Sequence, residues 1–492
     1  MAVLPYGVWA PDRFNHDSEF AGEALGVLPK ARSYGPWPGL ASTSKAVGDP
    51  VRGAFTARKD NGTFVVFCGT ADALYKFSGV SADWIDVSKS GGYSLPSDGF
   101  WSFTQFDKYL IATNGIDNPQ YIDVDSGTEF ADLTGAPKAK FCKTVGDYVW
   151  LAQLGAAQGP AASAGEIQVI WSGQRDPLHW EIGEKSCDFA TFWDGGFVQG
   201  VTSLIGGLVI LRSGIQRFGV GSYRAFDFAP VLDAQGTDSP SSIVQDEAAV
   251  YFYSPGGFTA IAGGVEKIGF ELVDDWFSDR VDQNRVNEVM GALDPVRKRI
   301  FWAFHTVDSS GDAFNHIIAY DTRLKRWTHA EMDTTTVFPA ASPGMNLSDI
   351  ATLYPQLDQV PYPFGSRVWQ GGAPGLAAFG TDEKLSFFAG QSLAARVQTS
   401  LFQPVPGARA FVNGFRAIDD AQSGTGSVAV SERPQGAAQV LPPGGVNTEG
   451  VIPARASGRY MRFQRDIPAG DEWENLQGID FDDGMIVEDG GR

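Results

Sequence analysis

The feature that most constrains the fold of this chain is a short segment that recurs along most of its length. Each copy has an apolar stretch, a polar turn, and then a strand of four to six mostly apolar residues that is usually followed by glycine. This pattern is typical of a β-hairpin with a tight turn. The seven copies are GAFTARKDNGTFVVFCG (53–69), WSFTQFDKYLIATNG (101–115), AKFCKTVGDYVWLAQLG (139–155), VQGVTSLIGGLVILRSG (198–214), SSIVQDEAAVYFYSPGG (241–257), VMGALDPVRKRIFWAFH (289–305) and LAAFGTDEKLSFFAG (376–390).

The spacing of the copies predicts the architecture. Most copies end about 40–50 residues after the previous one, a period that with four strands per unit indicates β-propeller blades. In several units a second hairpin follows, with aromatic residues on either side of its turn that are expected to pack across strands or between blades. The predicted pairs are Tyr75 with Trp84, Tyr121 with Phe130, and Tyr320 with Trp327. We therefore predict an all-β fold with a β-propeller of six or seven blades at residues 51–391.

One stretch, Trp171–Glu181, shows the parts of such a unit in compact form. An apolar run at Ile167–Trp171 ends on Ser-Gly, and a polar turn containing Asp176 and Pro177 follows. Trp180 is then predicted to open the next strand. The whole stretch is interpreted as a β-hairpin with aromatic residues at its edges.

The first 50 residues lack the repeat. The segment GVLPKARSYGPWPG (26–39) carries three prolines around Tyr34 and Trp37. Proline at this density disfavours a helix and a central strand, because it removes backbone donors and restricts the residue before it. We predict an extended N-terminal arm at residues 1–50 that is held by its aromatic side chains.

The chain beyond residue 391 also lacks the period. Short strands alternate with turns through residues 392–492, which predicts a separate C-terminal domain like a β-sandwich. Two long intervals in the repeat are predicted to hold insertions. One is an exposed Gly/Ala-rich loop at 154–165, and the other is a segment without clear strands at 331–372. An insertion as long as the second is more often functional or interfacial than idle. A short helix is predicted at 274–289 from the spacing of its valines.

Charge and cysteine content exclude several classes of protein. The net charge is −20, so the chain is not expected to adhere to DNA through released counterions. Either the charge serves solubility or it keeps a surface close to DNA from sticking to it. Three scattered cysteines predict neither a disulfide framework nor a zinc site. No secretory signal and no apolar run of about 20 residues is evident, and synthesis in a cytoplasm is expected.

Several motifs along the chain resemble one family of viral proteins. They are the arm SYGPWPG (33–39), the unit IWSGQRDPLHWE (170–181), ALDPVRKRIFWAF (292–304) followed by AYDTRLKRWTHAEM (319–332), and the C-terminal run at 455–492. The chain is similar in these motifs to the tail proteins of short-tailed bacteriophages that are known as tail tubular protein B, nozzle or packaged-DNA stabilisation proteins.

The resemblance implies a β-propeller protein of the virion that is made in the host cytoplasm. Proteins of this family form a ring, typically sixfold, below the portal and adaptor. The ring lines the DNA exit channel and helps to retain packaged DNA before ejection. The implied partners are further copies of the chain, adaptor and portal-proximal proteins, tail fibre or spike proteins, and genomic DNA that passes without sequence-specific binding. The family has no catalytic motif, so no enzymatic activity is expected.

Two other classes remain open. A carbohydrate-binding or adhesive propeller on a tail or cell surface would present exposed tryptophan and tyrosine, on which sugar rings stack. A propeller glycosidase or lyase would need paired carboxylates at a set separation. Carboxylates are plentiful, but most are expected to lie in solvated turns, and no nucleophile elbow occurs. The acidic residues considered are Asp274, Asp275, Asp419, Asp420, Asp471, Glu472, Asp482 and Asp483.

No residue is predicted to be catalytic, to bind a cofactor or to ligate a metal. The histidines lack the spacing of metal ligands on one element, and each is expected to be structural or exposed. Asp123 and Asp125 in DVDSG are interpreted as a turn rather than a calcium loop, because the later ligands are missing. The five histidines are His16, His179, His305, His316 and His329.

Two groups of basic residues are candidates for protein contacts. Arg297, Lys298 and Arg299 lie in a predicted hairpin turn, where they are either solvated or dock an acidic partner. In the C-terminal domain, strand alternation predicts Arg459 and Arg465 on one face and Arg462 on the other. With Arg455, these arginines are hypothesised to form salt bridges between subunits, although exposed pairs contribute little each.

Overall fold

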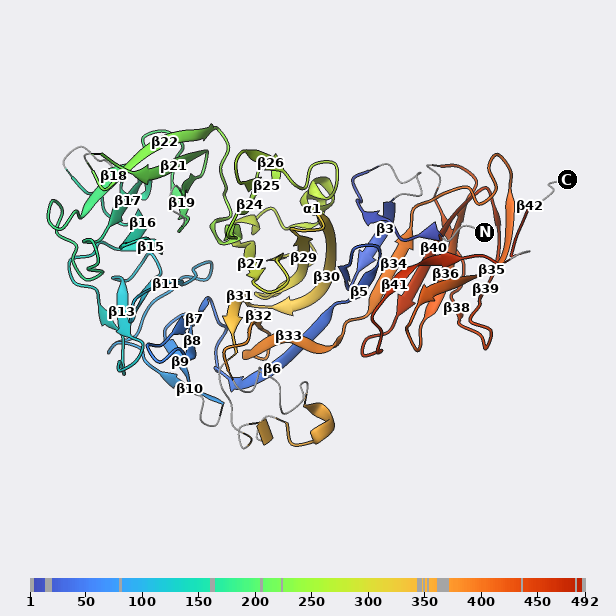
Figure 1. Cartoon of the computed structure of the whole chain (residues 1–492), viewed down its shortest axis with the longest axis horizontal. Helices are drawn as coiled ribbons and strands as arrows, with labels where there is room; N and C mark the ends of the chain where they lie inside the picture. Colours follow the sequence, from blue (N-terminus) through green and yellow to red (C-terminus); the bar gives the residue numbers. More distant parts are fainter. Residues whose placement is uncertain are drawn as a thin grey trace.

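The computed structural model of the chain describes residues 4–13, 20–78, 82–159, 164–203, 207–222, 224–342, 347, 350–351, 354–360, 371–434, 437–482 and 485–488. These residues form a β-propeller and a β-sandwich, which lie side by side along the long axis of the molecule (Figure 1). Both chain termini lie at the sandwich end.

The propeller contains seven four-stranded antiparallel meanders within the described residues. Six of them are separate sheets, and the other begins an 11-stranded sheet. The prediction of an all-β propeller with six or seven blades is confirmed. The first four blades are β7 (Ala54–Arg58) to β10 (Asp83–Asp86), β11 (Ser102–Phe106) to β14 (Ala131–Asp132), β15 (Ala139–Val145) to β18 (Asp188–Thr191), and β19 (Val198–Val201) to β22 (Phe226–Asp233).

The other three blades complete the circle. The fifth runs from β23 (Val244–Gln245) to β26 (Val265–Lys267), and the sixth contains β27 (Met290–Asp294), β28 (Arg299–Phe304), β29 (Phe314–Asp321) and β30 (Arg326–Thr334). The seventh contains β31 (Thr336–Ala341), β32 (Pro374–Phe379), β33 (Lys384–Ser392) and β6 (Pro38–Ala46). Inner strands are covered on both faces, as in the second strand of the fourth blade, β20 (Leu208–Leu211), where all four residues are buried. Such strands appear in the sequence as continuous apolar runs.

The seventh blade closes the propeller with a strand from the N-terminal region. Strand β6 pairs antiparallel with β33, and Ser42 lies opposite Ser386. The repeat copy at 376–390 therefore covers the second and third strands of its blade, whereas the other copies cover the first and second. The expectation that 331–372 lacks strands is wrong for its first residues, because β30 extends to Thr334 and β31 follows. Much of the remainder, including 361–370, lies outside the described residues.

The sandwich combines both ends of the chain. One sheet has the order β39-β35-β41-β5-β4, with β1 and β42 also paired to it. The other continues from the sixth blade through β3, β34, β40, β36 and β37, with β2 and β38 attached. The strands of the two sandwich sheets together are β1 (Leu4–Pro5), β2 (Val8–Trp9), β3 (Phe20–Leu25), β4 (Val27–Pro29), β5 (Tyr34–Pro36), β34 (Ala395–Thr399), β35 (Ala410–Asp419), β36 (Thr425–Ser431), β37 (Gln439–Val440), β38 (Gly444–Gly445), β39 (Ile452–Gly458), β40 (Tyr460–Ile467), β41 (Leu476–Asp480) and β42 (Ile486–Glu488).

Three local expectations differ from the structure. Strand β5 lies between β41 and β4, so the expectation that the proline-rich arm contains no central strand is wrong. The proline is tolerated because β5 pairs with β41 only at Tyr34↔Leu476, away from Pro36. Trp180 does not open a strand, because β18 starts at Asp188 and Trp180 is buried in the preceding loop. The helix α1 (Asp274–Arg280) is shorter than the predicted range. Among the described residues, no helix has the length and apolar character needed to span a membrane.

The predicted aromatic pairs differ in their contacts. Tyr320 and Trp327 are register partners with ring centroids 4.6 Å apart, as expected. Trp84 instead pairs with Phe77 across its hairpin, and its ring also packs 5.7 Å from Phe379 of the seventh blade. It therefore connects the first blade to the last. Tyr121 lies opposite Ala131, the neighbour of Phe130, so that pair is offset by one residue.

The propeller and the sandwich share one sheet and one hydrophobic core. Strand β3 lies between β30 of the sixth blade and β34 of the sandwich, and it meets β30 in parallel at Leu25↔His329. A single cluster of buried side chains runs from Trp302 in the blade past Trp9 to Phe463 in the sandwich. The two bodies are thus joined by backbone hydrogen bonds and by continuous apolar packing.

Candidate functional site

Three titratable side chains meet where the propeller joins the sandwich. Glu23 lies on β3, His329 on β30 and His316 on β29. Nε2 of His329 lies 2.5 Å from Oε1 of Glu23, and Nδ1 of His329 lies 2.9 Å from Nε2 of His316. The three side chains form one hydrogen-bonded chain across the junction.

Burial and neighbouring groups set the ionisation of two members of this cluster, His316 and Glu23. The Trp9 ring stacks on His329 with centroids 4.5 Å apart. Burial, together with the charges of His329 and Arg280, lowers the pKa of His316 to about 3, so its imidazole is neutral at pH 7. Burial by itself would raise the pKa of Glu23, but the hydrogen bond with His329 lowers it below its ordinary value. Glu23 is therefore an ionised carboxylate at neutral pH.

The cluster stabilises the junction and offers little to a substrate. His316 is 7% exposed at the wall of an open cleft of about 600 Å³ that Arg280, Asp308 and Glu331 also line. Within the described residues, no group of three or more His, Cys, Asp or Glu side chains is placed to hold a metal ion. The arrangement is best described as a buried polar connection between two bodies, because every member has a hydrogen-bond partner.

Part of this cluster could have been found from the sequence. The aromatic pair Tyr320 and Trp327 sets the register of one hairpin, and that register brings His329 near His316 on the same face. Glu23 gives no such signal, because it lies about 300 residues earlier and reaches the hairpin only through the tertiary fold.

The junction predicts a pH dependence that can be assigned to His316. Its folded pKa lies below the unfolded value, so the unfolded chain binds the proton first and His316 lowers stability as pH falls below about 6.5. Between pH 7 and pH 5 this amounts to about 2 kcal/mol. Chemical denaturation of the wild type and of His316→Phe should show the wild type losing that much more stability over this interval. Equal losses in the two proteins would contradict the assignment.

The remaining histidines lie apart from this cluster. His305 is buried, and its Nε2 lies 3.1 Å from Oε2 of Glu288. Burial would raise the pKa of Glu288, but His305 and Arg285 lower it to about 2. His179 is partly buried beside Glu184 at 3.7 Å, and His16 lies outside the described residues. Both contacts join side chains within the propeller.

The acidic residues singled out from the sequence mostly shape turns. Oδ1 of Asp123 accepts hydrogen bonds from the backbone N–H groups of Asp125 and Ser126, and these bonds, with Lys108 at 3.0 Å, lower its pKa to about 2. Oδ1 of Asp294 accepts the same pair of bonds at the β27–β28 turn. These are Asx turns, a common reason for aspartate at a hairpin.

Other carboxylates fasten segments that are distant in sequence. Asp420 accepts hydrogen bonds from the backbone N–H groups of Glu474 and Asn475, and Asp482 pairs with Arg416 at 2.7 Å. Asp274 accepts a bond from the backbone of Phe258, and burial raises its pKa to about 6. Asp471 accepts a bond from the backbone of Ser423, Asp275 lies in α1, Glu472 is exposed, and Asp483 lies outside the described residues.

The arginines of the sandwich do not act as a group. Arg465 is 1% exposed, and its Nε donates to Oδ2 of Asp419 at 2.7 Å. The hypothesis of an intersubunit bridge is therefore wrong for Arg465, whose partner is in the same chain. Arg462 lies on the opposite face of β40 and contacts Gln398, while Arg455 and Arg459 are exposed.

The basic turn between β27 and β28 borders a pocket at the seam between the sixth and seventh blades. Lys298 pairs with Asp246, and Arg299 pairs with Asp321 and donates to the carbonyl of Pro29. Arg297 is exposed, and no described residue accepts a hydrogen bond from its guanidinium or forms an ion pair with it. Arg297 is therefore the member of this group that is free to meet a partner.

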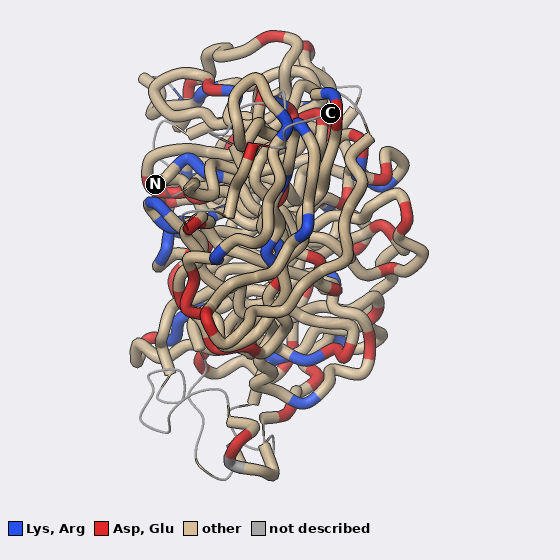
Figure 2. The backbone as a smooth tube through the Cα atoms, turned by 90° about the vertical axis from the view of Figure 1, so that its right-hand side faces the viewer, with Lys and Arg blue, Asp and Glu red and all other residues tan. Residues whose placement is uncertain are grey.

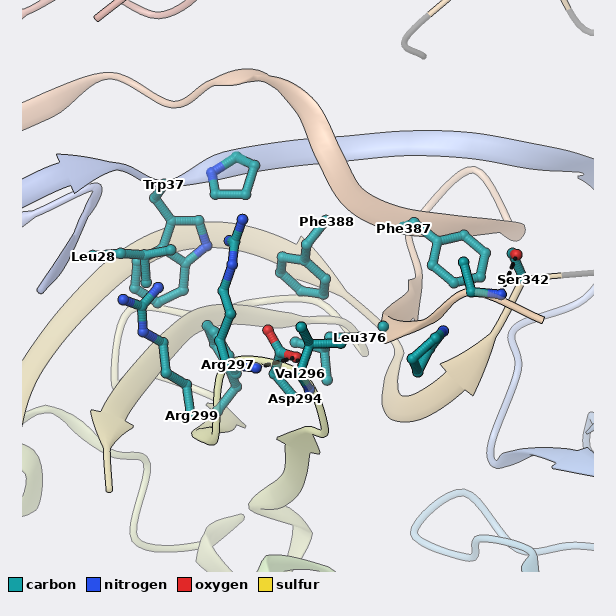
Figure 3. A pocket seen from close by; sticks show the side chains of 15 residues that line it. Leu28, Trp37, Asp294, Val296, Arg297, Arg299, Ser342, Leu376, Phe387 and Phe388 are labelled. Atoms are coloured by element: carbon teal, nitrogen blue, oxygen red, sulfur yellow. Dashed lines mark hydrogen bonds between the residues drawn. The ribbon is translucent and has the colours of Figure 1, made fainter. Parts of the chain in front are cut away.

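The pocket beside Arg297 has a cavity volume of about 190 Å³. Figure 3 shows the Arg297 side chain extending into the space between Trp37 and Phe388. Trp37 is fully buried, yet its indole N–H has no acceptor among the described residues. Leu28, Phe301 and Leu376 add apolar walls. The pocket thus combines one exposed, unpaired cation, Arg297, with an apolar lining.

Comparisons with known proteins give no family. No protein-family model matches the chain, and no curated protein sequence matches it. Among solved structures, the extracellular domain of BT4673 from B. thetaiotaomicron, described as a hybrid two component system, matches with a TM-score of 0.41 and 12% identity over 78% of this chain. This chain spans 44% of that protein. YCF48, bound to D1 peptide, matches with a TM-score of 0.36 and 10% identity over 72% of this chain and 97% of that one. The propeller assignment rests on the sheets described above.

Proposed function

We propose that this chain is a structural component of a bacteriophage tail, a nozzle or hub that forms a ring below the portal and adaptor. In this role it lines part of the DNA exit channel and retains packaged DNA before ejection. It acts as a homo-hexamer in the virion, without enzymatic activity or a cofactor. It contacts adaptor and portal-proximal proteins and tail fibre or spike proteins, and DNA passes it without sequence-specific binding.

The observation that carries this proposal is the continuous junction between propeller and sandwich. Domains in one chain usually move relative to each other unless their interface is large and apolar. Here the 11-stranded sheet and the shared core join both bodies into one elongated unit. A channel wall needs such a unit, because its shape must persist while DNA is held and then released. The motifs that resemble tail proteins include the sixth blade and β40, which both belong to this sheet.

The net charge of −20 supports a role next to DNA without adhesion to it. Like charges repel at short range, so an acidic channel wall keeps phosphates from binding. Figure 2 shows that positions of both charge signs occur along the backbone at the sandwich end of the molecule. A structure of the assembled tail with a predominantly basic channel would contradict this part of the proposal.

An adhesive propeller is the second candidate, and one side chain favours it. Trp193 is 61% exposed and could stack on a sugar ring. Most other tryptophans of the described residues are packed inside, so Trp193 is the one strongly exposed indole in the part of the chain that the structure describes. The buried ones are Trp9, Trp37, Trp101, Trp150, Trp171, Trp180, Trp276, Trp302, Trp327 and Trp473. Binding on a glycan array that is lost in Trp193→Ala would favour this candidate.

Immunogold electron microscopy tests the tail role directly. Antibody against the folded chain is applied to particles purified from the source culture, with antibody against an unrelated cytoplasmic protein as control. We expect gold at a single vertex below the capsid. Unlabelled particles, together with antigen found only in the soluble fraction or on cells, would overturn the proposal.

A further inference from the structure

The loop between the third and fourth blades presents an exposed aromatic knob. It runs from Trp193 to Phe197, and these two side chains are 61% and 43% exposed. Asp194 between them is also exposed. Trp193 is the only tryptophan among the exposed large apolar side chains of the described residues. Tryptophan is enriched at binding hot spots, so an exposed tryptophan is a candidate anchor for a protein contact.

Backbone conformation and hydrogen bonds order the loop that carries this knob. Gly195 and Gly196 have φ values of 102° and 75°, a region that other residues rarely adopt, and they turn the chain sharply. The carbonyls of Gly195 and Phe197 accept hydrogen bonds from the backbone N–H groups of Ser213 and Arg212 in the next blade. The exposed side chains are therefore presented by an ordered loop, which reduces the entropy lost on binding.

The pocket beside Arg297 is complementary to this knob. Its apolar walls suit an indole, and the free guanidinium of Arg297 suits the carboxylate of Asp194. Val296 at the rim is 53% exposed and adds apolar surface around the opening.

We propose that the Arg297 pocket receives the Trp193–Phe197 loop of a second copy of this chain. Within one molecule the two surfaces lie on opposite sides of the propeller, the loop near β18 and β19 and the pocket near β27 and β32 (Figure 1). The loop cannot reach its own pocket, so the contact joins different copies. A contact between two different patches repeats from copy to copy and produces a closed ring or an open helical stack. This inference deepens the proposed function by assigning its subunit contact.

A charge swap provides the sharpest test. Asp194→Arg places a cation opposite Arg297, and Arg297→Asp places an anion opposite Asp194, so each variant alone is expected to stay monomeric by mass photometry where the wild type assembles. Mixed together, the two variants restore opposite charges at every contact and are expected to assemble. If the wild type stays monomeric, or if either variant assembles as it does, the inference is overturned.

A truncation separates the apolar anchor from the charge. Trp193→Ser is expected to raise the dissociation constant of assembly by about thirtyfold, as for the loss of a central hot spot. Ile85→Ser is the matched control, since Ile85 is 51% exposed but lies on β10 of the first blade, and it should leave assembly unchanged. Equal effects of the two variants would contradict the docking contact. The two proposals can fail separately. If the variants assemble as the wild type does and particles that contain them still carry gold at one vertex, this contact is rejected but the tail role stands.

Discussion

Asp419→Ala should lower the free energy of unfolding by about 3–5 kcal/mol, the largest expected effect of removing one ionic group from this chain. Asp419 is 6% exposed and Arg465 is 1% exposed, and their salt bridge lies in the sandwich core at 2.7 Å. Arg465 also donates to the carbonyl of Ser423 at 3.0 Å. Without Asp419, the guanidinium remains buried with no opposite charge, and the cost of its desolvation is no longer offset.

Urea denaturation followed by circular dichroism measures this effect. The double variant Asp419→Ala/Arg465→Met should be more stable than Asp419→Ala, because it removes the unpaired charge as well. Arg396→Ala is the control, since its bridge to Asp466 is 48% and 26% exposed and should contribute at most about 1 kcal/mol. A loss in Asp419→Ala no larger than in Arg396→Ala would show that the buried pair contributes no more than the exposed one.

Trp150→Ala should also destabilise the protein by about 3–5 kcal/mol, in this case through lost packing. Trp150 on the third blade is fully buried and packs 4.7 Å from Phe218 and 4.7 Å from Phe226 on the fourth. Its indole N–H has no acceptor among the described residues, so the substitution breaks no hydrogen bond. The predicted loss therefore reports aromatic packing, both against Trp171 in the same blade at 5.2 Å and between the two neighbouring blades.

Thermal unfolding of three variants checks this prediction. Trp150→Phe should lose less stability than Trp150→Ala, because it leaves a smaller cavity. Ile85→Ala replaces an exposed apolar side chain outside the proposed subunit contact and should change the free energy of unfolding by no more than about 0.5 kcal/mol. If Trp150→Ala and Ile85→Ala unfold at the same temperature, the aromatic cluster does not hold these blades together.

The junction between propeller and sandwich explains why one polar cluster and one salt bridge matter in a mostly apolar core. Glu23, His329 and His316 connect strands of both bodies, and Asp419 with Arg465 connects the two sheets of the sandwich. In some proteins, polar groups that are buried and fully paired favour one arrangement of strands over others, and we expect the same of these contacts. These paired groups therefore act in addition to the 11-stranded sheet and the shared core, which join the two bodies.

The amino-acid sequence by itself determined the blades. Apolar strands separated by turn residues, and the regular period at which they recur, can be recognised in short stretches of sequence. They therefore predict the hairpins and the propeller without tertiary information. The aspartates of the turns follow the same logic, since Asp123 and Asp294 each bind backbone groups two and three residues further on. The pairing of Tyr320 with Trp327 also follows from hairpin symmetry.

Only the tertiary structure decided where the N-terminal segment goes and which charges are buried. Strands β3 and β6 pair with partners more than 300 residues away, and no local pattern encodes such a contact. Local patterns also do not encode the contacts of Glu23 with His329 and of Asp419 with Arg465, because the two residues of each pair lie on different strands. Chain folding brings these residues together because the closed propeller and the sandwich both need an additional strand, and the energy of burying them is gained only when the distant segments meet.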